Sequence, residues 1–198
     1  MSLKNVKIQA ITTPYSGFFK LNIVHFKHTL YTGGWTETFS RELFQRGQAV
    51  VVLLYDPVKE QVVLVEQCRA GALLNTEEDT QADAWLLEPV AGMIDVGESP
   101  IEAGIREAEE ETGAVIQSLE YVCQFYPSPG ACSEILHLYA ASISVDTIPE
   151  YAGLESEHED IKVVKLSFKK AKQMLLNAEF NVAATYIALQ WLFFQKIP

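Results

Sequence analysis

The stretch from Gly92 to Ala114 constrains this chain more than any other part of its sequence. It contains the run REAEEE, which is followed by Thr-Gly. Because each residue of an α-helix turns by about 100°, Glu107, Glu110 and Glu111 would share one helical face. Like charges at this spacing repel one another by only a few tenths of a kcal/mol in an exposed helix, so the cluster is tolerable without a cation. The same carboxylates are also the hard oxygen ligands that a divalent cation prefers.

The sequence specifies both ends of this expected helix. Ser99 followed three residues later by Glu102 matches a capping box, and Pro100 would occupy the first helical position. Gly113 supplies a C-terminal stop. We expect an apolar stripe to dock on the core and to leave the carboxylates facing a cleft. The stripe consists of Ile101, Ile105 and Ala108.

The whole stretch resembles the Nudix box. The residues that fill its defined positions are Gly92, Glu98, Arg106, Glu107, Ala108, Glu110, Glu111, Gly113 and Ala114. The resemblance implies an α/β fold, an α/β/α sandwich with a mixed sheet, on which a loop–helix–loop carries the catalytic groups. It also implies metal-assisted hydrolysis of a nucleoside diphosphate linked to another moiety. A solvated acidic helix face is the plain alternative for the glutamates alone.

The resemblance assigns roles to these positions one by one. Glu107 and Glu111 would be the principal ligands of Mg²⁺, or of Mn²⁺, and Glu111 would thereby be catalytic. Glu110 would join them in some members, and the carbonyl of Ala91 would be a further ligand. Carboxylate and carbonyl oxygens suit these ions better than Zn²⁺. Structural or orienting roles are implied for Gly92, Glu98 and Arg106.

Motifs outside the box resemble the ADP-ribose pyrophosphatase branch of the family. They are Gly17-Phe18-Phe19, Arg41-Glu42, Arg46-Gly47, Glu66-Gln67-Cys68-Arg69, Leu87-Glu88, Ser128-Pro129-Gly130 with Ser133-Glu134, and Glu157-His158-Glu159-Asp160-Ile161. Each is common alone, and their combination carries the resemblance. The branch implies cleavage of ADP-ribose to AMP and ribose 5-phosphate. A nucleotide-sugar pyrophosphatase of the GDP-mannose type and a non-catalytic nucleotide-sensing domain remain as alternatives.

The same branch implies that the catalytic base lies outside the box, on a late acidic loop. By position the base would be Glu157, and Glu155 and Glu159 are close alternatives because a one-residue slip in alignment is easy there. Solvated loop charges are the plain alternative for all of them.

Residues for substrate binding are also implied by the branch. Phe18 would stack on adenine, unless it is an ordinary core residue. Arg41 and Arg69 could hold phosphate or ribose through paired hydrogen bonds, with a surface salt bridge as the alternative. The remaining candidates for contact with the substrate are Glu42, Glu88 and Ser128.

Composition narrows the class of partner. A formal net charge of -11 argues against a nucleic-acid backbone as the main partner, so a small phosphate ligand would need metal ions beside the carboxylates. Three cysteines without metal-ligand spacing predict free, buried thiols rather than a disulfide framework. The N-terminal segment lacks a secretory apolar region, and no apolar run approaches about 20 residues, so we expect a cytoplasmic protein without a membrane span.

The chain divides into two expected regions. Residues 1–46 show alternating apolar positions and the turn dipeptide Gly33-Gly34, which predict a small antiparallel sheet. Such a sheet is too small to be secure alone, so we expect a dimerisation region. The branch implies a homodimer in which this sheet is exchanged between subunits. Residues 47–198 would form the Nudix-like domain, with helices capped by Ser167 and over 182–195.

Overall fold

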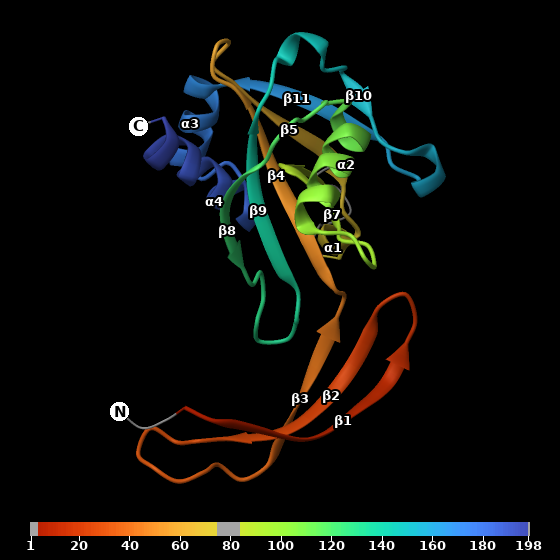
Figure 1. Cartoon of the computed structure of the whole chain (residues 1–198), viewed down its shortest axis with the longest axis vertical. Helices are drawn as coiled ribbons and strands as arrows, with labels where there is room; N and C mark the ends of the chain where they lie inside the picture. The colour runs from red at the N-terminus through yellow and green to blue at the C-terminus, as the bar shows by residue number, and fades with distance from the viewer. Residues whose placement is uncertain (1–3, 75–83, 198) are drawn as a thin grey trace. The chain divides into compact units, whose positions relative to one another are not determined.

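The computed structural model describes residues 4–74 and 84–197, and its elements are shown in Figure 1. Two compact units share the chain: residues 1–47 with 126–135, and residues 48–125 with 136–198. We call them the sheet unit and the sandwich unit. The sheet unit includes residues 126–135, which lie far along the sequence from residue 47. The predicted division at residue 46 did not place them in this unit.

The sheet unit contains a three-stranded antiparallel sheet in the order β1-β2-β3, as predicted. Its strands are β1 (Val6–Ser16), β2 (Lys20–His28) and β3 (Phe39–Gln45). The predicted turn lies between β2 and β3, where Gly33 and Gly34 have φ of 94° and 81°. These positive values favour glycine, which explains the dipeptide at this place. Every residue of β1 is exposed, so no other part of the sheet unit covers either face of that strand.

The sandwich unit is built on a large mixed sheet in the order β10-β11-β5-β4-β9-β8, with β6 paired to β5 and β7 paired to β4. The strands are β4 (Gln48–Asp56), β5 (Gln61–Cys68), β6 (Trp85–Glu88), β7 (Val90–Met93), β8 (Glu120–Phe125), β9 (Ile135–Ser142), β10 (Tyr151–Ala152) and β11 (Ile161–Ser167). The helical elements are α1 (Ala70–Leu73), α2 (Pro100–Thr112), η2 (Val145–Thr147), η3 (Glu155–Glu157), α3 (Phe168–Leu176), α4 (Ala183–Trp191) and η4 (Leu192–Lys196).

Alternation along the central strands divides the core between two faces of this sheet. On β4, Val50 and Val52 pack with Ala108 of α2, whereas Val51 packs in the cluster that includes Ala188 of α4. Successive side chains of a strand point to opposite faces, so one apolar run serves both layers. Figure 1 shows α2 on one side of the sheet and α3 and α4 on the other. The predicted α/β/α sandwich is therefore confirmed.

Helix α2 begins and ends as the sequence predicted. The Glu102 amide donates to Ser99 Oγ at 3.3 Å, and the Ser99 amide donates to Glu102 Oε2 at 2.8 Å, which completes the capping box. Gly113 ends the helix in the left-handed conformation, with φ of 67°. These caps satisfy backbone groups that would otherwise lack partners at the helix ends.

The buried stripe of α2 differs from the predicted one. Ile101 is 47% exposed, and the stripe consists of small residues that include Gly104 and Ala108. A Cβ on Gly104 would lie 2.7 Å from Leu119 Cδ1 and 3.1 Å from Val52 Cγ2 on β4, so glycine favours this close approach of the helix to the sheet. The same stripe continues to Glu111, whose carboxylate is therefore buried and not at a cleft surface as expected.

Three further expectations concern the thiols, one loop and membrane spans. All three cysteines are free, as expected, but Cys68 is exposed and Cys123 and Cys132 are only partly buried, so the expectation of buried thiols was wrong. In the loop expected over 71–84, α1 covers the first residues, and the acidic run 77–79 lies outside the described residues. Within 4–74 and 84–197, no helix has both the length and the apolar character to cross a bilayer.

Asp56 closes the turn between β4 and β5 and connects it to η2. Its Oδ1 accepts the amides of Val58 and Lys59 at 2.8 and 2.9 Å, and its Oδ2 accepts the amide of Val145 at 3.0 Å. Burial opposes ionisation here, but the backbone donors outweigh it and lower the pKa of Asp56. The charged form is therefore the one that stabilises the fold.

We expect Asp56→Asn to lower the free energy of unfolding by about 1–3 kcal/mol at neutral pH, because buried amides lose a charged acceptor. Urea denaturation measures this difference. Since the native pKa is lowered, the stabilisation is present above the ordinary carboxyl pKa and is lost as the pH falls through the native value. The difference in free energy of unfolding between wild type and variant should therefore shrink in acid. A difference that does not depend on pH would contradict this account.

Candidate active site

Glu111 lies on the inner side of α2 and is 1% exposed. Its Oε2 accepts the amide of Ala91 on β7 at 3.1 Å, and its Oε1 lies 3.4 Å from Gln67 Nε2 on β5. Burial raises the pKa of Glu111 to about 8, although the Ala91 amide and the charge of Arg69 lower it. A cation beside this carboxylate would favour its charged form and offset the cost of burial.

Glu107 lies one turn earlier on α2 and rests against the backbone of β7. A Cβ on Gly92 would collide with the Glu107 carboxylate, so this close approach requires glycine. Burial raises the pKa of Glu107, and the charges of Glu110 and Glu159 add to this effect, whereas Arg106 opposes it. Two carboxylates with raised pKa values on one helix form a site that a divalent cation would stabilise.

Arg106 holds the acidic residues around it in place. Its Nε and Nη2 donate to the two carboxylate oxygens of Glu98, both at 3.0 Å, which is a bidentate pair. Its Nη1 donates to Glu107 Oε1 at 2.7 Å and to Glu110 Oε2 at 3.0 Å, and Nη2 also donates to the carbonyl of Met93 at 3.1 Å. These bonds raise the pKa of Arg106 and lower that of Glu98. This geometry fits the orienting role that the sequence predicted for Arg106, since it fixes the carboxylates of Glu107 and Glu110.

The carboxylates do not form a finished metal cluster in this arrangement. Across the described ranges, no three His, Cys, Asp or Glu side chains converge as ligands of one ion. Arg106 supplies the positive charge to Glu107 and Glu110 instead. The donor set nevertheless fits a hard divalent cation, because the buried carboxylate of Glu111 and the partly buried carboxylate of Glu107 offer the oxygen ligands that such an ion prefers.

Arg69 and Glu88 lie at the ends of β5 and β6 and form an ion pair. Arg69 Nε is 2.6 Å from Glu88 Oε2, with side-chain exposures of 36% and 12%. Alternation along β5 points Gln67 and Arg69 to the same face as Val63 and Val65, which is the face that α2 covers. Arg69 therefore contributes positive charge near Glu111, as the lowering effect on that pKa shows.

The late acidic loop separates its three glutamates. Glu155 and Glu157 in η3 are exposed, whereas Glu159 is partly buried and its Oε2 accepts the Leu154 amide at 3.4 Å. The charge of Glu159 raises the pKa of Glu107 and that of Glu111. The loop is attached to α2 by the Gly153 amide, which donates to the carbonyl of Glu110 at 3.2 Å.

The other predicted site residues lie in the sheet unit. Phe18 is 85% exposed, so core packing does not account for it, and its ring packs edge-on against Phe19 at 4.7 Å between centroids. Arg41 Nη1 donates to the carbonyl of Ser40 at 2.8 Å. Glu42 on β3 and Ser128 are exposed. The candidates on α2 and the late loop, with Arg69 and Glu88, therefore belong to the sandwich unit, and Phe18, Arg41, Glu42 and Ser128 belong to the sheet unit.

Gln67 is the site residue that the sequence analysis missed. It was noted only as part of a motif, although it is 93% buried and lies beside Glu111. The signal was present, because Gln67 continues the alternation of Val63 and Val65 as a polar residue at a core-facing position. A polar residue at such a position indicates a buried hydrogen-bond partner.

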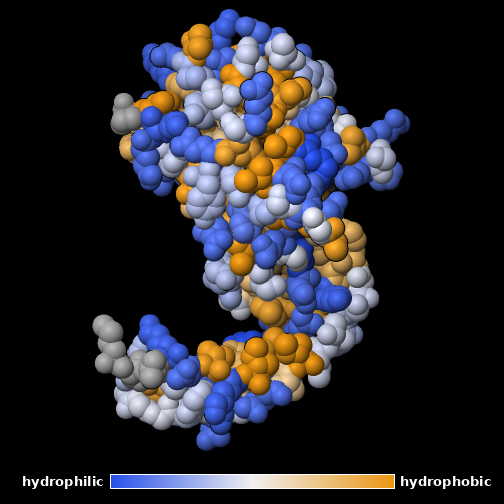
Figure 2. All heavy atoms as spheres, in the orientation of Figure 1, coloured by the Kyte–Doolittle hydropathy of each residue, from blue (hydrophilic) through white to orange (hydrophobic). Residues whose placement is uncertain are grey.

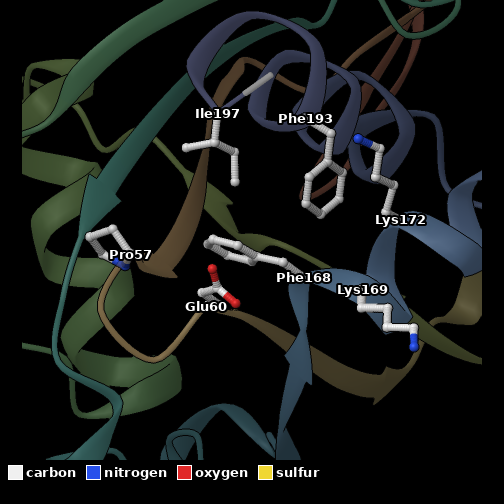
Figure 3. Close-up of a pocket in the computed structure, with 7 residues that line it drawn as sticks. All are labelled: Pro57, Glu60, Phe168, Lys169, Lys172, Phe193 and Ile197. Atoms are coloured by element: carbon white, nitrogen blue, oxygen red, sulfur yellow. The ribbon is translucent and has the colours of Figure 1, made fainter.

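A cavity of about 380 Å³ lies elsewhere in the sandwich unit. Figure 3 shows the side chains around it, which come from the β4–β5 turn, α3 and the C-terminal segment. They are Pro57, Glu60, Phe168, Lys169, Lys172, Phe193 and Ile197. None of the predicted site residues lines this cavity.

The fold and the buried acidic helix define a hydrolase of the Nudix type, and comparison with known proteins agrees. The model of the NUDIX domain matches residues 45–184. The chain belongs to the Nudix family. Enzymes of this family generally use divalent metal ions, which fits the donor set of α2.

Individual relatives cover most of the chain. The ADP-ribose pyrophosphatase of Escherichia coli (strain K12) is 41% identical over 188 residues, which is 95% of this chain and 88% of the relative. The ADP-ribose pyrophosphatase of Haemophilus influenzae is 37% identical over 96% of this chain and 87% of its own length. The GDP-mannose pyrophosphatase of Escherichia coli O1:K1 / APEC is 34% identical over 77% of this chain and 76% of its own length.

The contact of Gln67 with Glu111 gives a prediction about cation binding. We expect Gln67→Met, which keeps the shape but removes the donor, to weaken the binding of a divalent cation about 10-fold or more, as loss of a group that orients a ligand typically does. Isothermal titration with Mn²⁺ measures this affinity. Gln61→Met, at the other end of the same strand, is the matched control. Equal Mn²⁺ affinities in the two variants would show that Gln67 does not orient the carboxylate.

Proposed function

We propose that this protein is a Mg²⁺-dependent pyrophosphatase that adds water to ADP-ribose and releases AMP and ribose 5-phosphate. The observation that carries the proposal is the 41% identity to an ADP-ribose pyrophosphatase over 95% of the chain. The GDP-mannose pyrophosphatase is less similar and matches 77% of the chain, so that substrate is the second candidate. The buried carboxylates of α2 support hydrolysis over nucleotide sensing, since a domain that only binds has no need to bury them.

Four groups would hold the Mg²⁺ ion, or Mn²⁺ in its place. They are the carbonyl of Ala91 and the carboxylates of Glu107, Glu110 and Glu111. When bound, the metal would neutralise the pyrophosphate and lower the pKa of a bound water. Gly92 leaves room for Glu107, and Arg106 with Glu98 fixes the direction of the carboxylates.

The general base is proposed to be Glu157, with Glu155 and Glu159 as the alternatives. Glu157 is exposed on η3, where it is accessible to water, and the resemblance to the branch favours its position. Glu159 is the loop glutamate whose charge acts on the α2 carboxylates. A base must reach the attacking water, and a loop residue can approach it when substrate binds.

Substrate recognition is proposed for residues of both units. Phe18 offers an exposed ring for stacking on adenine, and the exposed residues Arg41, Glu42 and Ser128 would contact the phosphates or ribose. Arg69 and Glu88 would contribute from the sandwich unit.

A homodimer with exchanged sheet units is part of the proposal, with residues 1–46 as the dimerisation region. Apolar side chains of β1 support it, because a monomer rarely exposes so many together. Those more than half exposed are Val6, Ile8, Ile11 and Tyr15, and Figure 2 shows apolar residues gathered on the sheet unit. The acidic net charge supports the absence of a nucleic-acid partner, and a cytoplasmic location stays a prediction.

The substrate assignment is tested with purified protein, Mg²⁺ and a panel of ADP-ribose, GDP-mannose and NADH, followed by chromatography of the products. We expect the highest kcat/KM with ADP-ribose and equimolar AMP and ribose 5-phosphate. Preferred turnover of GDP-mannose would replace the substrate, and nucleotide binding without turnover of any compound would favour the sensor.

The catalytic role of the α2 carboxylate is tested by substitution. We expect Glu111→Gln to lower kcat at least about 10³-fold, since removing an interaction made in the transition state costs rates of this order. Glu109→Gln, on the exposed face of the same helix, is the control and should keep wild-type turnover. Wild-type turnover of Glu111→Gln would disprove the metal assignment.

The choice between the loop glutamates requires three variants. We expect Glu157→Gln to reduce kcat about 10²–10⁴-fold, as the loss of a general base does, and Glu155→Gln and Glu159→Gln to reduce it far less. Stopped assays at saturating ADP-ribose and Mg²⁺ measure all three. A larger loss of kcat in Glu155→Gln or Glu159→Gln than in Glu157→Gln would transfer the role to that residue.

A further inference from the structure

The segment 126–135 is held against β3 by backbone hydrogen bonds. The Phe44 amide donates to the carbonyl of Ala131 at 2.7 Å, and the Ser133 amide donates to the carbonyl of Phe44 at 3.1 Å. Phe44 and Cys132 thereby form a parallel bridge. The segment carries Ser128 and belongs to the sheet unit, although it is far from β3 in sequence.

An ion pair joins the same two parts of the sheet unit. Glu134 is 6% exposed, and its Oε1 lies 3.0 Å from Nε of Arg46, which directly follows β3. Burial raises the pKa of Glu134 and the charge of Arg46 lowers it, so removal of Arg46 takes away the charge that favours the ionised carboxylate. Arg46 is the ion-pair partner of Glu134 in the described part of the chain.

Aromatic contacts continue from this ion pair to Phe18. The guanidinium of Arg46 lies over the ring of Phe19, with Cζ 5.3 Å from the ring centroid. Phe19 packs against Phe44 at 5.2 Å and against Phe18 at 4.7 Å, in both cases edge to face. A continuous set of contacts therefore leads from the exposed ring of Phe18 to Glu134.

We propose that Arg46 and Glu134 are positioning residues that hold the Ser128 loop in register with the Phe18 ring, so that a nucleoside diphosphate sugar meets both already in place. This rests on the proposed function, in which Phe18 and Ser128 contact the substrate. Groups fixed before binding lose less conformational freedom when the substrate arrives, which favours affinity. Neither Arg46 nor Glu134 needs to touch the substrate for this effect.

The proposal predicts a specific kinetic signature. The candidate metal ligands lie in the sandwich unit, whereas this ion pair lies in the sheet unit. Loss of the pair should therefore weaken binding of the substrate and leave the chemical step intact, which raises KM with kcat nearly unchanged. A general loss of structure would lower kcat and the melting temperature instead.

The experiment compares Glu134→Gln, Arg46→Met, the double variant and Arg46→Lys. We expect KM for ADP-ribose to rise about 10-fold in Glu134→Gln and in Arg46→Met with kcat within about twofold, and the double variant to resemble these two, because the effects of coupled residues are not additive. Arg46→Lys keeps the charge and should recover part of the loss. The control is Asp146→Asn, which breaks the exposed Lys59–Asp146 pair of the sandwich unit and should change neither constant.

Hydrogen exchange gives a readout that does not depend on the substrate. In Glu134→Gln, the amide of Ser133 should exchange faster than in the wild type, while the amides of β4 keep their rates. Unchanged exchange at Ser133, additive effects in the double variant, or a fall in kcat at constant KM would each overturn the proposal. If the wild type does not hydrolyse ADP-ribose, the proposed function fails, and the exchange result still decides whether the ion pair holds the loop.

Discussion

The burial of one carboxylate, that of Glu111, is the constraint on which the rest of the site depends. A charge removed from water is costly unless it is paired or hydrogen-bonded, and here Ala91 and Gln67 supply neutral donors to its two oxygens. The pKa of Glu111 remains raised to about 8, which indicates that these donors offset only part of the cost of burying the charge. A divalent cation is the partner that would complete the compensation, and this links the packing of α2 to the chemistry of the family.

The sequence was sufficient for the parts of the fold that depend on local chemistry. The capping box and Gly113 set the limits of α2, and alternating apolar residues set the strands, because these signals act within a few residues. The burial of Glu111 was not predictable in this way, since it depends on how closely Gly104 lets α2 approach the sheet. The link between Phe44 and Cys132 was also missed, because pairing between distant segments has no local signal.

The site residues divide by unit, and this division explains why the box alone does not name a substrate. Glu107 and Glu111, which we propose as the principal cation ligands, lie on α2 of the sandwich unit. Phe18 and Ser128, which we propose as contacts of the nucleotide and sugar, lie in the sheet unit. Selectivity between substrates would then change without any change in α2.

Thermal unfolding of the wild type and Glu111→Gln, each with and without Mg²⁺, tests the central claim most directly. If the buried carboxylate is retained for a cation and not for stability, the variant should melt at the same or a higher temperature without Mg²⁺, because its neutral amide is cheaper to bury. Saturating Mg²⁺ should then raise the melting temperature of the wild type only, by preferential binding to the native state. A variant that melts well below the wild type without metal, and that Mg²⁺ stabilises equally, would contradict the account.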